Sequence, residues 1–225
     1  MDIKIVVNSN RNFYQMTLPP LLNSLKEAGF RENEIISFVG GYEGEASEIE
    51  NNIFTLPYDS IDFTSLIELS QNDYGSGYYF MIHDTTKVGP NFKKLLYSVE
   101  PEEYEVIALK RWDSMNIGLY RGEYLKRKSE ILLPLQNYEL TPEKLQESKR
   151  WGVANEDFLM WHQPDVKISC YSEILSCPRN GTPDVAGPFN YYGNGTNRII
   201  ERYQFLDFYK IKANWSLDDQ YVIQL

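Results

Sequence analysis

Short apolar runs alternate with helically spaced apolar positions along the first half of the chain. β-Branched and aromatic runs at 3–7, 34–39, 52–56, 78–82 and 106–109 predict five strands. Apolar residues three or four apart predict helices at 19–28, 62–69 and 90–96, the second capped by Asp62. The strands do not alternate strictly with polar residues, which predicts burial on both faces. This order predicts an α/β fold with a mostly parallel central sheet flanked by helices.

The pattern changes after residue 110. Segment 138–151 is polar with helical spacing, 177–196 is rich in Gly and Pro and predicts a long loop, and 198–215 predicts a terminal helix and strand. A length of 225 residues suits one domain. We therefore expect a single domain over 1–225, made of a first half (1–110) and a second half (111–225).

Four polar loops follow the predicted strands, at 8–12, 40–44, 58–62 and 83–87. Ligands of open parallel sheets bind at the carboxyl ends of the strands, so these loops are where a site is expected. The sequence contains neither G-x-G-x-x-G nor G-x-x-x-x-G-K-[ST]. The specific signals for a dinucleotide site and for a P-loop are therefore missing.

The charge balance excludes some partners. The chain has 22 Lys and Arg against 32 Asp and Glu, a net charge of −10, which disfavours nucleic-acid binding because phosphates require a basic face. Two cysteines are too few for a disulfide framework. With no signal segment and no apolar stretch of about 18 residues, we expect a cytoplasmic protein without membrane insertion.

The strand at 78–82 ends abruptly in His83, Asp84, Thr85 and Thr86. A carboxylate at a strand end can hold Mg²⁺ or Mn²⁺ bridging two phosphates, and His83 could add an imidazole ligand. The alternative is a structural Asp84 that caps the following turn, with His83 in a polar rim. The residues alone leave both interpretations open.

Segment 78–92 resembles the metal-binding segment of GT-A glycosyltransferases, in which an apolar strand ends in an Asp-x-Asp-type motif. Here His83-Asp84-Thr85 stands at the motif with one acidic residue, and Gly89-Pro90-Asn91-Phe92 matches the start of the next helix. Segment 3–11 resembles the family's first strand and nucleotide-edge loop, 39–43 its base or ribose contact, and 116–120 its acceptor-side turn. The resemblance covers about residues 1–165. It extends to small enzymes of this family found in large algal DNA viruses.

The resemblance implies a set of site residues. The nucleotide sugar would contact Asn8, Ser9, Asn10, Arg11, Gly41, Tyr42, Asp62, His83 and Asp84. The acceptor would contact Trp112, Asn116, Gly118 and Trp151. The metal ligands would be Asp84, His83 and His162. The general base would be Asp157, with Glu156 as second choice, and only one of these neighbours on a helix would face the cleft.

The resemblance also implies a function. A hexosyl or deoxyhexosyl group would move from a nucleoside-diphosphate sugar, such as a UDP-sugar, to a hydroxyl of a glycan or glycoprotein, assisted by Mn²⁺ or Mg²⁺. The first half would bind the nucleotide sugar and the second the acceptor, in the host cytoplasm if the source is viral.

Two alternatives stay open. One is a non-catalytic nucleotide-sugar or carbohydrate-binding module on the same fold, since the triplet keeps a single acid. The other is a nucleotidylyltransferase, which loop 8–12 disfavours because it has no glycine to cradle a triphosphate.

Overall fold

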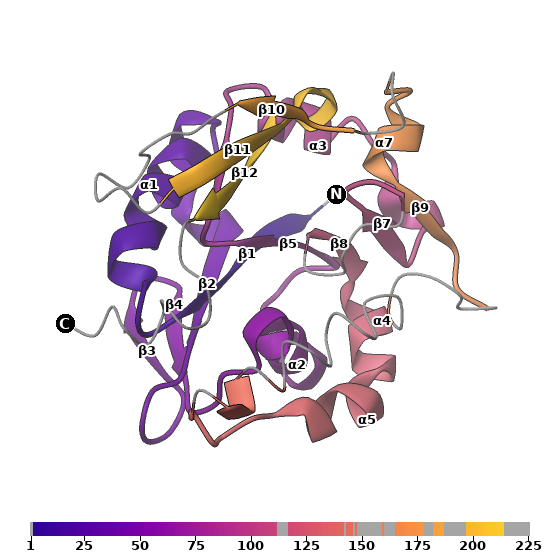
Figure 1. Cartoon of the computed structure of the whole chain (residues 1–225). Coiled ribbons are helices and arrows are strands. Elements are labelled where there is room, and N and C mark those ends of the chain that lie inside the picture. The colour runs from indigo at the N-terminus through magenta and orange to yellow at the C-terminus, as the bar shows by residue number, and fades with distance from the viewer. Residues whose placement is uncertain are drawn as a thin grey trace.

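The structure, a computed structural model, describes residues 2–111, 117–141, 143–145, 147, 159, 165–177, 182–186 and 197–213. Within this part, a large sheet has the strand order β3-β4-β2-β1-β5-β8-β7-β9 (Figure 1). Its strands are β1 (Ile3–Asn10), β2 (Ile35–Gly40), β3 (Ser47–Glu50), β4 (Ile53–Leu56), β5 (Tyr78–His83), β7 (Val106–Ala108), β8 (Gly118–Arg121) and β9 (Ile168–Cys170). The central strands β4, β2, β1 and β5 run parallel, whereas β3 and β8 are antiparallel to their neighbours. The predicted α/β fold with a mostly parallel sheet is confirmed.

A second sheet lies at the top of Figure 1, with the strand order β10-β11-β12-β6. It consists of β6 (Thr86–Val88), β10 (Asp184–Ala186), β11 (Asn197–Tyr203) and β12 (Phe208–Ala213), all paired antiparallel. Because β6 follows β5 after a two-residue turn, this small sheet is attached directly to the end of a central strand.

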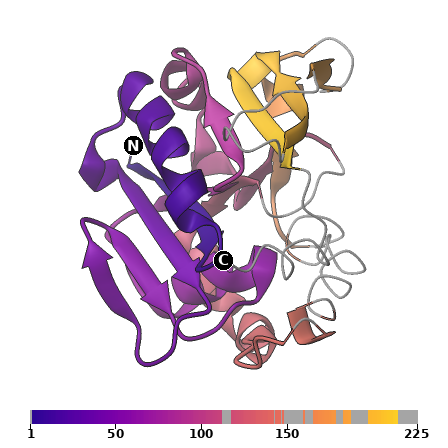
Figure 2. The same cartoon turned by 60° about the vertical axis from the view of Figure 1, so that its left-hand side comes forward.

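Helices cover both faces of the large sheet. The α-helices are α1 (Tyr14–Glu27), α2 (Thr64–Gln71), α3 (Phe92–Leu96), α4 (Gly122–Arg127), α5 (Ser129–Leu132) and α7 (Tyr171–Ile174). The 3-10 helices are η1 (Glu32–Glu34), η2 (Ile61–Phe63), η3 (Pro101–Glu103), η4 (Leu133–Leu135) and η6 (Gln204–Leu206). Figure 2 brings α1 to the front, with the small yellow sheet beside it. Each helix in the described residues is too short or too polar to cross a membrane.

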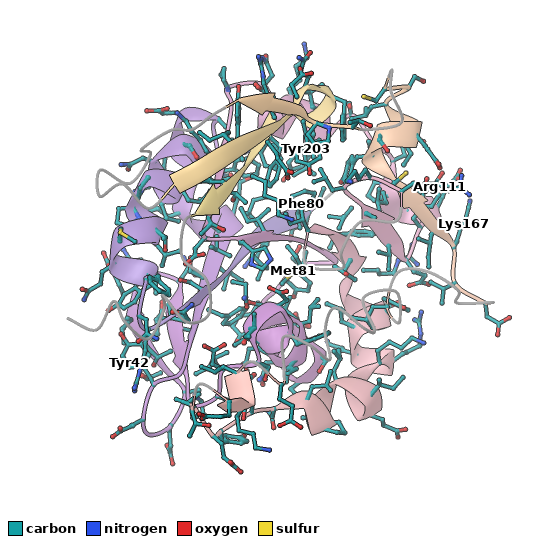
Figure 3. All side chains as sticks on the ribbon, in the orientation of Figure 1. Tyr42, Phe80, Met81, Arg111, Lys167 and Tyr203 are labelled. Atoms are coloured by element: carbon teal, nitrogen blue, oxygen red, sulfur yellow. The ribbon has the colours of Figure 1, made fainter. Side chains whose placement is uncertain are left out.

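The alternation of side chains along a strand builds two cores, one on each face of the large sheet. Ile5 and Phe80 belong to the core under α1, α3 and the small sheet, whereas Val6 and Met81 belong to the core under α2 and α4. Figure 3 shows Phe80 and Met81 leaving β5 on opposite sides. This alternation also decides where polar side chains point at the strand ends.

Three predicted elements need correction. The first helix begins at Tyr14 and not at residue 19, and Pro19 and Pro20 lie inside it. Asp62 does not cap α2: it lies within η2, and the N-cap residue is Phe63, which makes no side-chain cap hydrogen bond. The terminal helix predicted in 198–215 is wrong, because 197–213 forms β11, η6 and β12.

Candidate functional site

The carboxyl ends of three central strands meet at one edge of the large sheet. In the strand register, Asn8 of β1 lies beside His83 of β5, and Asn10 lies beside Gly40 of β2. The structure therefore brings together the predicted loop residues of β1, β2 and β5. We call this region the strand-end site, defined by residues 8–12, 40–42, 59–62 and 83–86.

Asp84 lies at the centre of a buried hydrogen-bond cluster. Its Oδ2 accepts hydrogen bonds from Ser9 Oγ and from Thr17 Oγ1, each at 2.6 Å. Its backbone N–H donates to Asn8 O at 3.1 Å, and the residue is only 7% exposed. Burial raises the pKa of Asp84, although the two hydroxyl donors oppose this shift. Thr17 was not a sequence candidate, because it precedes the residue where the helix was expected to begin.

His83 points to the other face of the sheet, because successive side chains of a strand alternate. Its Nε2 lies 3.3 Å from Asp62 Oδ1, and the side chains of the two residues are 16% and 33% exposed. His83 and Asp84 are neighbours in sequence that contact different elements. His83 contacts η2, whereas Asp84 contacts β1 and α1.

Asn8 ties β1 to α2. Its Nδ2 donates to Ile61 O at 2.7 Å, and its Oδ1 accepts from Ser65 N at 3.0 Å and Ser65 Oγ at 2.6 Å. Both polar atoms of the amide are thus engaged with the protein. Asn10 ends β1, and its Oδ1 accepts from Asn12 N at 3.0 Å, which shapes the loop that leads into α1.

Arg11, Gly41 and Tyr42 form the exposed flank of the site. Gly41 has a φ of +89°, which favours glycine, and a Cβ there would lie 3.7 Å from Cγ and Cδ of Arg11. The Arg11 side chain therefore runs along this glycine. Tyr42, labelled in Figure 3, packs edge-on against Tyr14 with ring centroids 6.1 Å apart. Burial raises the pKa of Tyr42 to about 12.

Arg11 is the cation that this flank offers to a ligand. It is exposed, and its backbone N–H donates to Gly40 O at 3.0 Å. Within the described part of the chain, its guanidinium has no hydrogen bond or ion pair.

Asp59 is a carboxyl group that the sequence analysis did not single out, although it lies in the predicted strand-end loop 58–62. Its Oδ1 accepts from Ile61 N at 2.8 Å. Burial raises the pKa of Asp59 to about 6, and the carboxylates of Asp62 and Asp84 add to the shift. Negative charges thus act on one another across this edge of the sheet.

The described residues do not fit a metal centre. Asp84 Oδ2 is engaged by two hydroxyls, and His83 points to the opposite face. Across the ranges given above, no group of three or more His, Cys, Asp and Glu residues could hold a metal ion. The metal role of Asp84 and His83 stays a prediction, because its third residue, His162, is outside those ranges.

Gly118 of the predicted acceptor side is buried in the large sheet, where β8 places it beside Met81 and Ala108. The remaining candidates lie outside the described residues: Trp112, Asn116, Trp151, Glu156, Asp157 and His162. Their acceptor, base and metal roles stay predictions.

Comparisons with known proteins give structural similarities at low identity. No family model and no curated protein matches the chain. Glycosyltransferase GlyE of Streptococcus pneumoniae TIGR4 is 11% identical with a TM-score of 0.46, over 76% of this chain and 45% of that chain. S. aureus TarS 1–349 in complex with UDP-GlcNAc is 14% identical with a TM-score of 0.39, over 57% and 47%. The similarity to this chain thus spans about half the length of these two structures.

These comparisons give no support to the algal-virus source. The fold class rests on the strand order of this chain, and its function has to be argued from its own residues.

Proposed function

We propose that the chain is a glycosyltransferase that binds a nucleoside-diphosphate sugar at the strand-end site and transfers the sugar to a hydroxyl group. One observation carries the proposal: the ends of β1 and β2 present Arg11, Gly41 and Tyr42 at the carboxyl edge of a mostly parallel sheet. This edge is where folds of this class bind their ligands.

The surroundings of Arg11 suit a diphosphate. A guanidinium with free N–H donors recognises phosphate oxygens by charge-assisted hydrogen bonds. Helix α1 follows the Arg11 loop directly, without a side-chain cap hydrogen bond and without an acidic residue in its first turn. Within this first turn, Thr17 Oγ1 donates to the Asp84 carboxylate, so the positive charge offered to a diphosphate is that of Arg11. We place the diphosphate by Arg11 and the nucleoside by Tyr42.

The reaction breaks the bond from the sugar's anomeric carbon to a phosphate oxygen and forms a bond from that carbon to the acceptor oxygen. Negative charge grows on the leaving diphosphate, and Arg11 is placed to stabilise it. The acceptor hydroxyl loses its proton to a base, which we propose to be Asp157, with Glu156 as second choice. The group transferred would be hexosyl or deoxyhexosyl, and the acceptor a glycan or glycoprotein.

Melting temperatures in the presence of UDP, GDP, CDP and ADP test donor binding. A ligand of the folded state stabilises it by mass action, so one nucleotide should raise the melting temperature. Turnover of the matching nucleotide sugar is then measured with glycan acceptors. Asp157→Asn should lose most turnover and keep nucleotide binding. Failure of every nucleotide to shift the melting temperature would refute the proposal.

A second candidate is a binding module without turnover. The observation that favours it is the burial of Asp84 among Ser9 and Thr17, which leaves the carboxylate engaged within the protein. This candidate predicts that a nucleotide sugar binds but is not consumed with any acceptor, and that Asp157→Asn changes nothing.

A further inference from the structure

We infer that Arg11, and not a divalent cation on Asp84, supplies the positive charge that faces the donor's diphosphate, and that Asp84 positions the loop carrying Arg11. The inference rests on the proposed function. It starts from a disagreement between the Asp-x-Asp-type motif that the sequence resembles and the contacts that its residues make.

The first part of the disagreement is Asp84 itself. Its Oδ2 receives two O–H donors at 2.6 Å, from β1 and from α1, and the side chain is buried. A magnesium ion needs carboxylate oxygens at about 2.0–2.1 Å in a near-octahedral shell that keeps several waters. Binding an ion at Oδ2 would displace both hydroxyls. These two hydrogen bonds join the turn after β5 to β1 and to α1.

The second part is the rest of the triplet. His83 is directed to Asp62 on the other face of the sheet. The Thr85 carbonyl accepts from Ile211 N at 2.9 Å, and Thr86 Oγ1 donates to His83 O at 2.7 Å. These groups hold the small sheet and the turn after β5, and they do not converge with Asp84 on a shared ion.

Arg11 lies in the loop that the hydrogen bonds of Asp84 hold in place. Ser9, which donates to Asp84, stands two residues before Arg11, and Thr17, the other donor, stands in the helix that follows the Arg11 loop. Asp84 therefore fixes both ends of the segment from which Arg11 extends along Gly41. Among the described residues, the Arg11 guanidinium is in no ion pair.

Calorimetric titration with nucleoside diphosphates tests the inference. UDP, GDP, CDP and ADP are titrated into the full chain in EDTA and again in MnCl₂. We expect the nucleotide that binds to have the same affinity, within about twofold, in both conditions. Arg11→Gln should weaken it roughly 10- to 100-fold, the size of a lost charged hydrogen bond. The matched control is Arg31→Gln, which removes an exposed arginine before the start of β2, at the opposite sheet edge, and should leave the affinity unchanged.

Asp84→Asn separates the two roles of this residue. If Asp84 positions the loop, the variant binds nucleotide more weakly by the same factor in EDTA and in MnCl₂. Ser9→Ala and Thr17→Ala should weaken binding in the same metal-independent way, and they replace Asp84→Asn if that variant does not fold. A purely structural role would lower the melting temperature of these variants without changing nucleotide affinity in the folded protein.

Three results overturn the inference. The first is nucleotide binding that requires Mn²⁺ in the wild type and no longer requires it in Asp84→Asn. The second is an unchanged nucleotide affinity in Arg11→Gln, and the third is an unchanged affinity in folded Asp84→Asn, Ser9→Ala and Thr17→Ala. Absence of binding by any nucleotide to the wild type in either condition is a different result, since it refutes the proposed function itself.

Discussion

The carboxyl groups of Asp62 and Asp84 lie within electrostatic reach of Asp59. The pKa of Asp59 is raised to about 6, first by burial and then by the charges of Asp62 and Asp84. The folded state therefore holds the Asp59 proton more tightly than the unfolded state does. This contribution to stability is present below about pH 4 and is lost as the pH rises through about 6.

Asp59→Asn tests this pH dependence, because the amide resembles the protonated carboxyl and does not titrate. The free energy of unfolding of the wild type, relative to Asp59→Asn, should fall between about pH 4 and pH 7. Urea denaturation of both proteins across this range measures the difference. Two stability curves that stay parallel over the whole range would contradict the raised pKa.

At the residue scale, the sequence identifies which loops hold the site but not all of its members. Adjacent positions such as His83 and Asp84 must point to opposite faces once 78–83 is known to be a strand. Thr17, the partner of Asp84 in α1, lies outside the predicted helix, because the apolar spacing placed that helix at 19–28. Asp59 belongs to no motif, and its raised pKa comes from its folded surroundings, which the sequence does not show.

At the element scale, the junction between β6 and α3 depends on Gly89. A Cβ at Gly89 would collide with the carboxyl group of Asp207. That carboxyl cannot move freely, because its Oδ2 accepts from Asn91 N at 3.0 Å and from Asn91 Nδ2 at 3.3 Å. Gly89→Ala must therefore break these hydrogen bonds or displace the start of α3.

We expect Gly89→Ala to lower the free energy of unfolding by about 1–3 kcal/mol, as overpacking in a tight site does. The control is Gly77→Ala, since a Cβ at Gly77 meets no atom within 4 Å. That substitution should change stability by no more than about 0.5 kcal/mol. Chemical denaturation measures both, and equal effects of the two substitutions would refute this account of Gly89.

The strands that sequence patterns predicted, such as β1, β2 and β5, have apolar residues on both faces. Strand β3 was missed because all its residues are exposed and its sequence, Ser-Glu-Ile-Glu, has little apolar character. The segment 197–213 contains apolar residues at spacings that suit a helix as well as a strand. Its strand conformation goes with the pairing of β11 with β10 and of β12 with β6, partners that a local pattern does not reveal.

At the scale of the whole molecule, a ligand has two competing places, at opposite ends of the central strands of the large sheet. The strand-end site lies at one end. At the other, a groove of about 640 Å³ is lined by Tyr78, Arg121 and Lys126 among others. Its size alone does not decide the matter, since Lys126 is paired with Asp73 and the Arg121 guanidinium with Glu105.

Hydrogen exchange with and without the bound nucleoside diphosphate distinguishes the two places. We expect slower amide exchange at 8–13, 40–42 and 83–86, because ligand binding suppresses local opening around its site. Amides at 73–79 and 121–126 should exchange as before. Protection confined to this second set would place the ligand in the groove and contradict the strand-end assignment.

The attachment of the small sheet has a consequence for the order in which the protein is completed. Asn91 and Asp207 are hydrogen-bonded although 116 positions separate them, and Thr85 receives its hydrogen bond from Ile211. During synthesis from the N-terminus, β1, β2 and β5 leave the ribosome long before β12 exists. The turn that carries Asp84 therefore acquires its last backbone partner only when residue 211 has been translated, and closing so long a loop is slow.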